Sequence, residues 1–128
     1  MGHLPEPAPE VAAGVPAPGR LAVVLFLRGG RVGELCHALA GTDLAQRADL
    51  AVVVAAPASD APCPTAAAVV EDPTAELARR YGVRTPRGGG PPVGYAVVDW
   101  SGDTRYRTLD PTVAQQLDEV ATILGAAP

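Results

Sequence analysis

The chain has 128 residues, 48% of them hydrophobic and 19% charged, and its net charge is −4. These values are typical of one soluble globular domain and argue against a nucleic-acid or anionic-membrane partner. No apolar run approaches the roughly 18 residues that span a bilayer, and the N-terminus lacks the features of a secretory signal. We therefore expect a cytoplasmic protein. The lysine-free, arginine- and alanine-rich composition is typical of a high-GC bacterial genome.

The first half of the chain predicts a tail followed by alternating strands and a helix. Met1–Gly19 is rich in Pro and Ala and has no regular period, which predicts a flexible tail at 1–19 and a folded domain at 20–126. The apolar runs Leu21–Arg28 and Leu50–Ala56 predict buried, adjacent parallel strands. Between them, Leu35 and Leu39 share one helical face.

The second half predicts a helix, a hairpin and a final helix. Asp72-Pro73-Thr74 is a helix start, in which the Asp72 side chain caps the first amides. Tyr95–Asp99 and Thr104–Thr108 predict an antiparallel hairpin. Asp110-Pro111-Thr112 repeats the capped helix start, and a long amphipathic helix follows from Val113 to Leu124. The order β-α-β-α-β-β-α predicts an α/β fold with a four-stranded mixed sheet flanked by helices. A strand fragment is also predicted at Val69-Val70.

Three segments carry a resemblance to a known family. VVEDPTAELARRYGV, GYAVVDWSGDTRYRTLDP and the strand LAVVLFLR resemble the thioredoxin-like peroxiredoxins, the family of alkyl hydroperoxide reductase C and thiol-specific antioxidant proteins. The resemblance implies a thioredoxin-like fold and a reactive cysteine in the loop after the first strand. In the family, a helix N-terminus and a nearby arginine lower the pKa of that thiol.

The expected cysteine pattern is missing from that loop. The family's P-x-x-x-T-x-x-C motif is absent, and Val32 and Leu35 occupy the positions that a CxxC pair would take. The departure falls on the catalytic atoms, and a scaffold does not carry function once its site has changed. We therefore expect a non-catalytic binding or accessory module, with no cofactor and no metal.

Cys36 supports an alternative interpretation as the nucleophile of a one-cysteine peroxidase or reductase. Arg28 and Arg31 precede it, but it lies about one turn inside the expected helix, where the dipole effect is fading. The competing interpretation is a small buried core residue. Cys63 lies in a Pro-rich loop. A redox sensor using both thiols is a third, weaker hypothesis. We expect no Cys36–Cys63 disulfide, because Cys36 should lie one turn inside its helix and a disulfide needs Cα atoms within about 7 Å.

We expect the binding site at the edge of the sheet formed by the carboxyl ends of the parallel strands. Its candidate residues are Arg28, Arg31, Val32, Leu35, Pro92 and, as a surface anchor, Trp100. An apolar centre at Val32 and Leu35 ringed by charges would suit a protein partner or self-association. The alternative is that Val32 and Leu35 are buried and that Trp100 covers core. Pro92 stands where thioredoxin-like proteins carry a cis-proline, and its cis and trans forms remain alternatives here.

Overall fold

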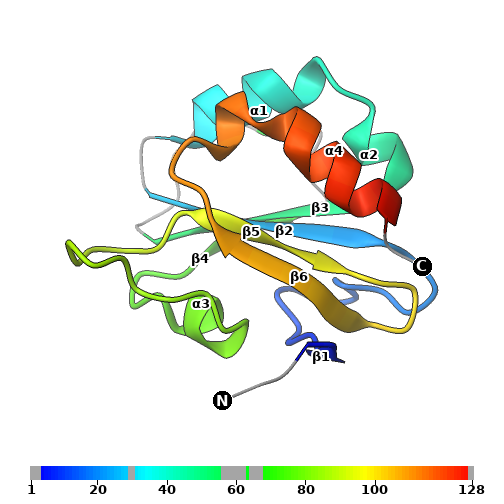
Figure 1. The fold of residues 1–128 in the computed structure, drawn as a ribbon, viewed down its shortest axis with the longest axis horizontal. Helices are drawn as coiled ribbons and strands as arrows, with labels where there is room; N and C mark the ends of the chain where they lie inside the picture. The colour runs from blue at the N-terminus through cyan, green and yellow to red at the C-terminus, as the bar shows by residue number, and fades with distance from the viewer. Residues whose placement is uncertain (1–3, 29–30, 56–62, 64–67, 127–128) are drawn as a thin grey trace.

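The computed structural model describes residues 4–28, 31–55, 63 and 68–126, and within them a single mixed sheet carries helices on both faces (Figure 1). The strands are β1 (Glu6–Pro7), β2 (Ala22–Leu27), β3 (Asp49–Val54), β4 (Ala68–Glu71), β5 (Gly94–Val98) and β6 (Asp103–Leu109). The helices are α1 (Val32–Ala40), α2 (Leu44–Arg47), α3 (Glu76–Arg80), the 3₁₀ turn η1 (Val113–Gln115) and α4 (Leu117–Ala126).

The strand pairing confirms the predicted α/β arrangement and extends it. β2 and β3 are parallel neighbours, with Ala22 opposite Asp49 and Leu27 opposite Val54, and β5 and β6 pair antiparallel. The described residues form six strands in the order β1-β6-β5-β2-β3-β4, rather than the four expected. The predicted fragment at 69–70 is β4, parallel to β3, and the other added strand is β1.

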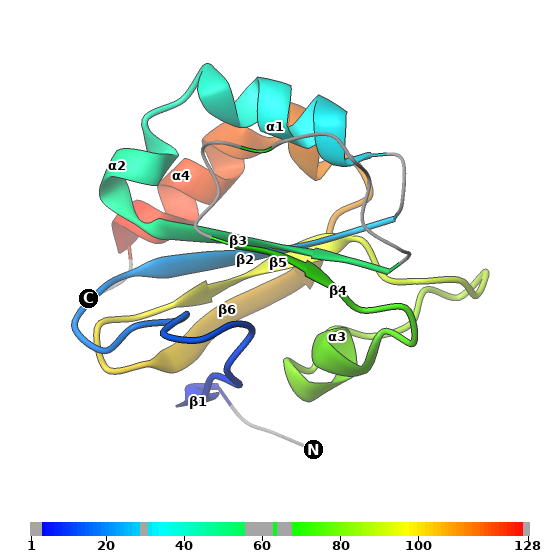
Figure 2. The same ribbon diagram turned by 180° about the vertical axis from the view of Figure 1, so that it is seen from behind.

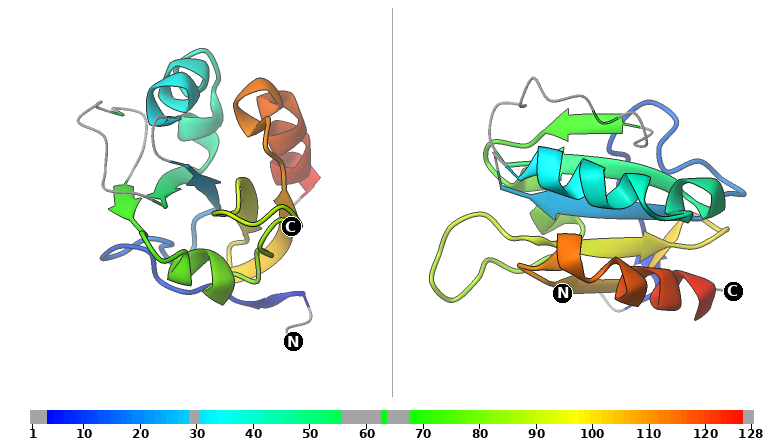
Figure 3. Two further views of the ribbon diagram at one scale, coloured as in Figure 1. Left: turned by 90° about the vertical axis from the view of Figure 1, so that its left-hand side faces the viewer. Right: turned by 90° about the horizontal axis from the view of Figure 1, so that it is seen from above.

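Two hydrophobic layers bury the two faces of the sheet. α1, α2, η1 and α4 cover one face, on which Val23, Leu25 and Val52 point into the larger core. α3 and part of the N-terminal segment cover the other, around Phe26 and Tyr81. The end-on view in Figure 3 shows the helices on opposite sides of the strands. Every residue of β2 and β5 is buried, which explains their unbroken apolar sequence.

The N-terminal segment differs from the flexible tail that composition predicts. Glu6–Pro7 pairs with Thr104 and Asp103 at the edge of β6. Val11 is buried in the smaller core, and the Tyr81 hydroxyl donates to the carbonyl of Pro9. Figure 2 shows this segment running beneath the sheet. Proline-rich composition gives no period that would reveal such packing, because the segment is neither helical nor a regular strand.

Both predicted caps are present, but the helices after them start late. The Asp72 carboxylate accepts the amides of Leu77 and Ala78, at 3.1 and 3.3 Å, and α3 begins only at Glu76, after Ala75 adopts a left-handed φ of 57°. The Asp110 carboxylate accepts the amide of Thr112. The single long helix expected after it is instead split into η1 and α4.

Candidate functional site

The edge of the sheet at the end of β2 does not expose the apolar pair that we expected there. Val32 is 1% exposed and Leu35 is 0% exposed, and both belong to the core beneath α1. The prediction of a contact site centred on these two side chains is therefore wrong. The alternative, that both are buried, is confirmed. A helix whose buried residues include Val32, Leu35 and Leu39 turns that stripe toward the sheet.

A pocket of about 200 Å³ lies beside these residues, at the same edge. We call it the edge pocket. Its apolar lining comes from the end of β2, the residue before β5, the end of β6 and η1. Its polar lining comes from the connection between β2 and α1, from α1 and from η1. The described lining residues are Leu27, Arg28, Arg31, Glu34, Pro86, Val93, Leu109, Pro111, Val113, Ala114 and Gln115. The pocket thus joins segments that are far apart in the sequence.

The charges at the edge pocket are unequally neutralised. Arg31 forms an ion pair with Glu34 at 3.1 Å, and the Gln115 amide also donates to the Glu34 carboxylate. These two hydrogen bonds, the one from Gln115 first, lower the pKa of Glu34. Arg28 has only a long contact, 3.5 Å from its Nε to the carbonyl of Pro91, and no ion pair with a described residue. Among the described residues, the pocket therefore carries one positive charge, that of Arg28, without an ion-pair partner.

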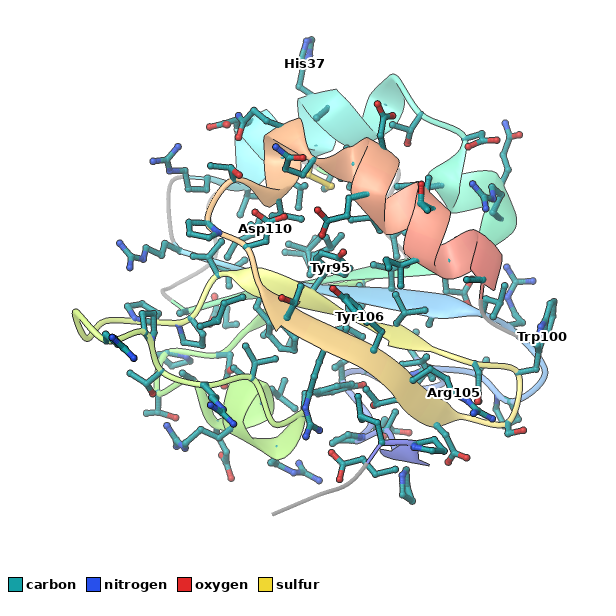
Figure 4. All side chains as sticks on the ribbon, viewed as in Figure 1. His37, Tyr95, Trp100, Arg105, Tyr106 and Asp110 are labelled. Atoms are coloured by element: carbon teal, nitrogen blue, oxygen red, sulfur yellow. A yellow bond between two sulfur atoms is a disulfide. The ribbon has the colours of Figure 1, made fainter. Side chains whose placement is uncertain are left out.

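The other predicted binding residues do not join this pocket. Pro92 is buried, and the Pro91–Pro92 bond is not among the cis bonds of the described residues, so it is trans. Trp100 is 51% exposed and lies at the β5–β6 turn, at the right of Figure 4. Val98 is opposite Ala22, the first residue of β2. Trp100 is therefore at the opposite end of the strands from the edge pocket, with about half of its surface exposed.

The two cysteines form a disulfide, so the prediction that they remain apart is wrong. Their Cα atoms are 5.4 Å apart, within the range that a disulfide requires. Cys36 is 7% exposed and belongs to the core, and Cys63 packs partly buried against that core. Cys36 lies in the second turn of α1, as expected. Its side chain packs in the core and is also bonded to Cys63, in the connection between β3 and β4.

Sequence reasoning missed the β6 and η1 side of the edge pocket. Leu109, Val113 and Ala114 all line it, and an uninterrupted final helix would not have placed them together at this edge. No local signal marked the break, because it falls at Gln116, whereas Pro111 precedes η1, where a helix tolerates proline.

The described residues offer no cluster of three or more His, Cys, Asp or Glu side chains for a metal ion. Among the same residues, no helix is both long and apolar enough to cross a membrane. His37 points outward from α1, away from the sheet (Figure 4).

Sheet order, pairing and helix placement define a thioredoxin-like fold. The solved structures that resemble it include a putative thiol:disulfide interchange protein DsbE from Chlorobium tepidum, with 15% identity, a TM-score of 0.55, and coverage of 94% of this chain and 96% of that one. AhpC of Mycobacterium bovis aligns with 17% identity and a TM-score of 0.52, over 85% of this chain and 69% of that one. AhpC of Enterococcus faecalis aligns with 15% identity and a TM-score of 0.52, over 84% of this chain and 78% of that one. No protein-family model and no curated protein sequence matches this chain.

Proposed function

We propose that this protein is a non-catalytic binding or accessory module on a thioredoxin-like scaffold. In this proposal the edge pocket receives an apolar group that carries a negative charge. The observation that supports it is the pocket itself, which lies where β2 meets α1. The resemblance to peroxiredoxins puts a reactive cysteine in that loop, whereas the residues there are Arg28, Arg31 and Glu34 around an apolar lining.

The chemistry of the lining supports this ligand class. Small-molecule and side-chain sites are mostly apolar, with a few polar groups that fix orientation. Leu27, Val93 and Val113 supply the apolar part. Arg28 supplies a guanidinium without an ion pair among the described residues, and a guanidinium is well suited to a carboxylate or sulfonate.

Binding of anilinonaphthalene sulfonate, an apolar aromatic anion, tests the proposal. We expect saturable fluorescence enhancement with the folded wild-type protein and its loss in Ala114→Glu, which fills the pocket and adds a negative charge beside Glu34. Ala45→Glu is the matched control, because Ala45 is exposed on α2 and does not line the pocket. Equal binding to wild type and Ala114→Glu, with both folded by circular dichroism, would contradict the proposal.

The disulfide favours a second candidate function, that of a thiol oxidoreductase. In this candidate a dithiol reductant donates two electrons to the Cys36–Cys63 bond and becomes a disulfide itself, and the two released thiols then reduce a peroxide or a substrate disulfide. The low exposure of Cys36 argues against it, because the sulfur of a reactive cysteine must be accessible to its substrate. Cys63, which is half-buried, would be the point of attack.

Peroxide consumption and insulin reduction with a dithiol reductant separate the two candidates. We expect wild type to be no faster than Cys36→Ser in either assay. A fast wild-type rate that is lost in both Cys36→Ser and Cys63→Ser would establish the oxidoreductase and remove the non-catalytic proposal, whatever the edge pocket binds.

A further inference from the structure

A second concave surface, separate from the edge pocket, gathers arginine side chains. It has a volume of about 840 Å³ and lies between α3, the loop after it and β6, on the face of the sheet that α3 covers (Figures 1 and 2). Its charged lining residues are Arg79, Arg80, Arg84, Arg107 and Glu6. The chain has ten basic residues and a net charge of −4. Four of these basic residues line this surface, and Glu6 is the one carboxylate among its described lining residues. We call this surface the arginine groove.

Arg107 is held in a fixed position in the groove. Its guanidinium pairs with Glu6 and donates to the carbonyl of Tyr81 at 3.3 Å. It lies directly over Gly82, where an added Cβ would be 2.5 Å from Arg107 Nη1. Gly82 also has a φ of 77°, a conformation that glycine adopts at little cost. The absence of a side chain at Gly82 therefore makes room for the Arg107 head group.

Arg80 and Arg84 present unused donors beside this fixed group. Both are exposed, and neither makes a hydrogen bond or ion pair with any residue in the described part of the chain. Arg79 donates to the carbonyl of Thr74 at 2.7 Å and keeps its charge at the rim. Each guanidinium carries five donors in a planar fork that matches phosphate oxygens. Placing several positive charges close together is unfavourable because they repel one another, and a bound anion relieves that repulsion.

We propose that the arginine groove binds a small ligand that carries two or more linked phosphate groups. Several guanidiniums from separate segments match several anionic groups, and the volume of the groove falls in the range of sites for whole small ligands rather than single ions. The charges of Arg80, Arg84 and Arg79 face solvent, so the ligand reaches them without disturbing the core. Nothing in this proposal depends on the ligand of the edge pocket.

Isothermal titration calorimetry with inorganic tripolyphosphate tests the proposal on the full chain. We expect saturable binding that weakens as salt rises, because exposed charge pairs are screened. The Arg80→Ser/Arg84→Ser variant should bind at least about tenfold more weakly, since charge-assisted hydrogen bonds are lost. Arg20→Ser/Arg47→Ser removes the same charge from two exposed arginines that line neither the arginine groove nor the edge pocket, and this variant should bind like wild type.

Three results would overturn it. The first is the absence of tripolyphosphate binding to wild type. The second is an equal loss in both double variants, which would show only a response to net charge. The third is tighter binding of hexaglutamate than of tripolyphosphate, which would show an acidic-peptide surface instead. Circular dichroism of each variant confirms that the comparison is between folded proteins.

Discussion

Cys36 and Cys63 are joined across 27 residues of sequence, linking the second turn of α1 to the connection between β3 and β4. The bond closes a loop that contains β3, a central strand of the sheet. A crosslink of this kind stabilises the folded state mainly by reducing the conformational freedom of the unfolded chain.

The disulfide should therefore contribute measurably to stability. For a closed loop of this length, Cys63→Ser is expected to lower the free energy of unfolding by about 3.5 kcal/mol. Urea denaturation with and without a reductant measures it: reductant should shift the wild-type midpoint and leave the variant unchanged. A wild-type midpoint that is indifferent to reductant would show that the bond does not form in solution.

Val32 should tolerate no charge, because it is buried at the start of α1. Val32→Asp is expected to cost about 3–5 kcal/mol, the scale of an uncompensated buried charge. Gly33→Asp is the matched control: Gly33 is exposed, and an added Cβ meets no atom within 4 Å. There the carboxylate stands near a helix N-terminus and replaces a poor helix former, so stability should stay the same or rise slightly. Thermal unfolding of both variants checks the contrast.

Two buried tyrosines should make the protein sensitive to alkali. Burial raises the pKa of Tyr81, with Arg80 opposing in part, and burial followed by the hydrogen bond with Glu119 raises the pKa of Tyr95. Their neutral forms are thus favoured in the folded state, whereas unfolded tyrosine ionises near pH 10. This stability is full below about pH 10 and is lost as the pH rises from there toward the folded-state pKa values.

The measurement is urea unfolding at about pH 8 and about pH 10.5, on either side of the ordinary tyrosine pKa. Tyr81→Phe/Tyr95→Phe should lose less stability between the two conditions than wild type does, although its stability at the lower pH is reduced by the loss of the Tyr81–Pro9 and Tyr95–Glu119 hydrogen bonds. Parallel losses in the two proteins would assign the alkaline sensitivity to other groups.

Gly82 should be intolerant of any side chain. Gly82→Ala places a methyl group against the Arg107 guanidinium and forces a left-handed conformation that costs about 1–2 kcal/mol. We expect that loss in the free energy of unfolding, together with weaker tripolyphosphate binding as Arg107 moves. Gly88→Ala is the control, since an added Cβ there meets nothing within 4 Å. Equal stability of the two variants would mean that Arg107 does not depend on Gly82.

The core strands and their pairing could be predicted from the sequence because their signals are local. Leu21–Arg28 and Leu50–Ala56 are unbroken apolar runs of strand length, and the connection between them is long enough, and helical in its pattern, to form the crossover that parallel strands need. Asp72 and Asp110 could likewise be recognised as caps. Their helices start late because Ala75 and Gln116 take conformations that no propensity specifies.

The site was harder to predict because its parts meet only in three dimensions. The Cys36–Cys63 bond depends on the course of a connection that has no period, and the position of Cys36 in a helix said little about its neighbour across the fold. The edge pocket depends on the break between η1 and α4. The arginine groove joins Arg107 on β6 to Arg80 and Arg84, and the adjacency of α3 and β6 follows from tertiary packing.

The proline-rich start of the chain has a consequence for handling the protein. On the face of the sheet that α3 covers, α3 is only five residues long, and the segment containing Val11 completes the layer over Phe26 and Tyr81. A protein shortened to begin at Arg20 would uncover aromatic surface and the outer edge of β6 together. Exposed sheet edges beside apolar patches promote aggregation, so such a truncation should precipitate where the full chain remains monodisperse.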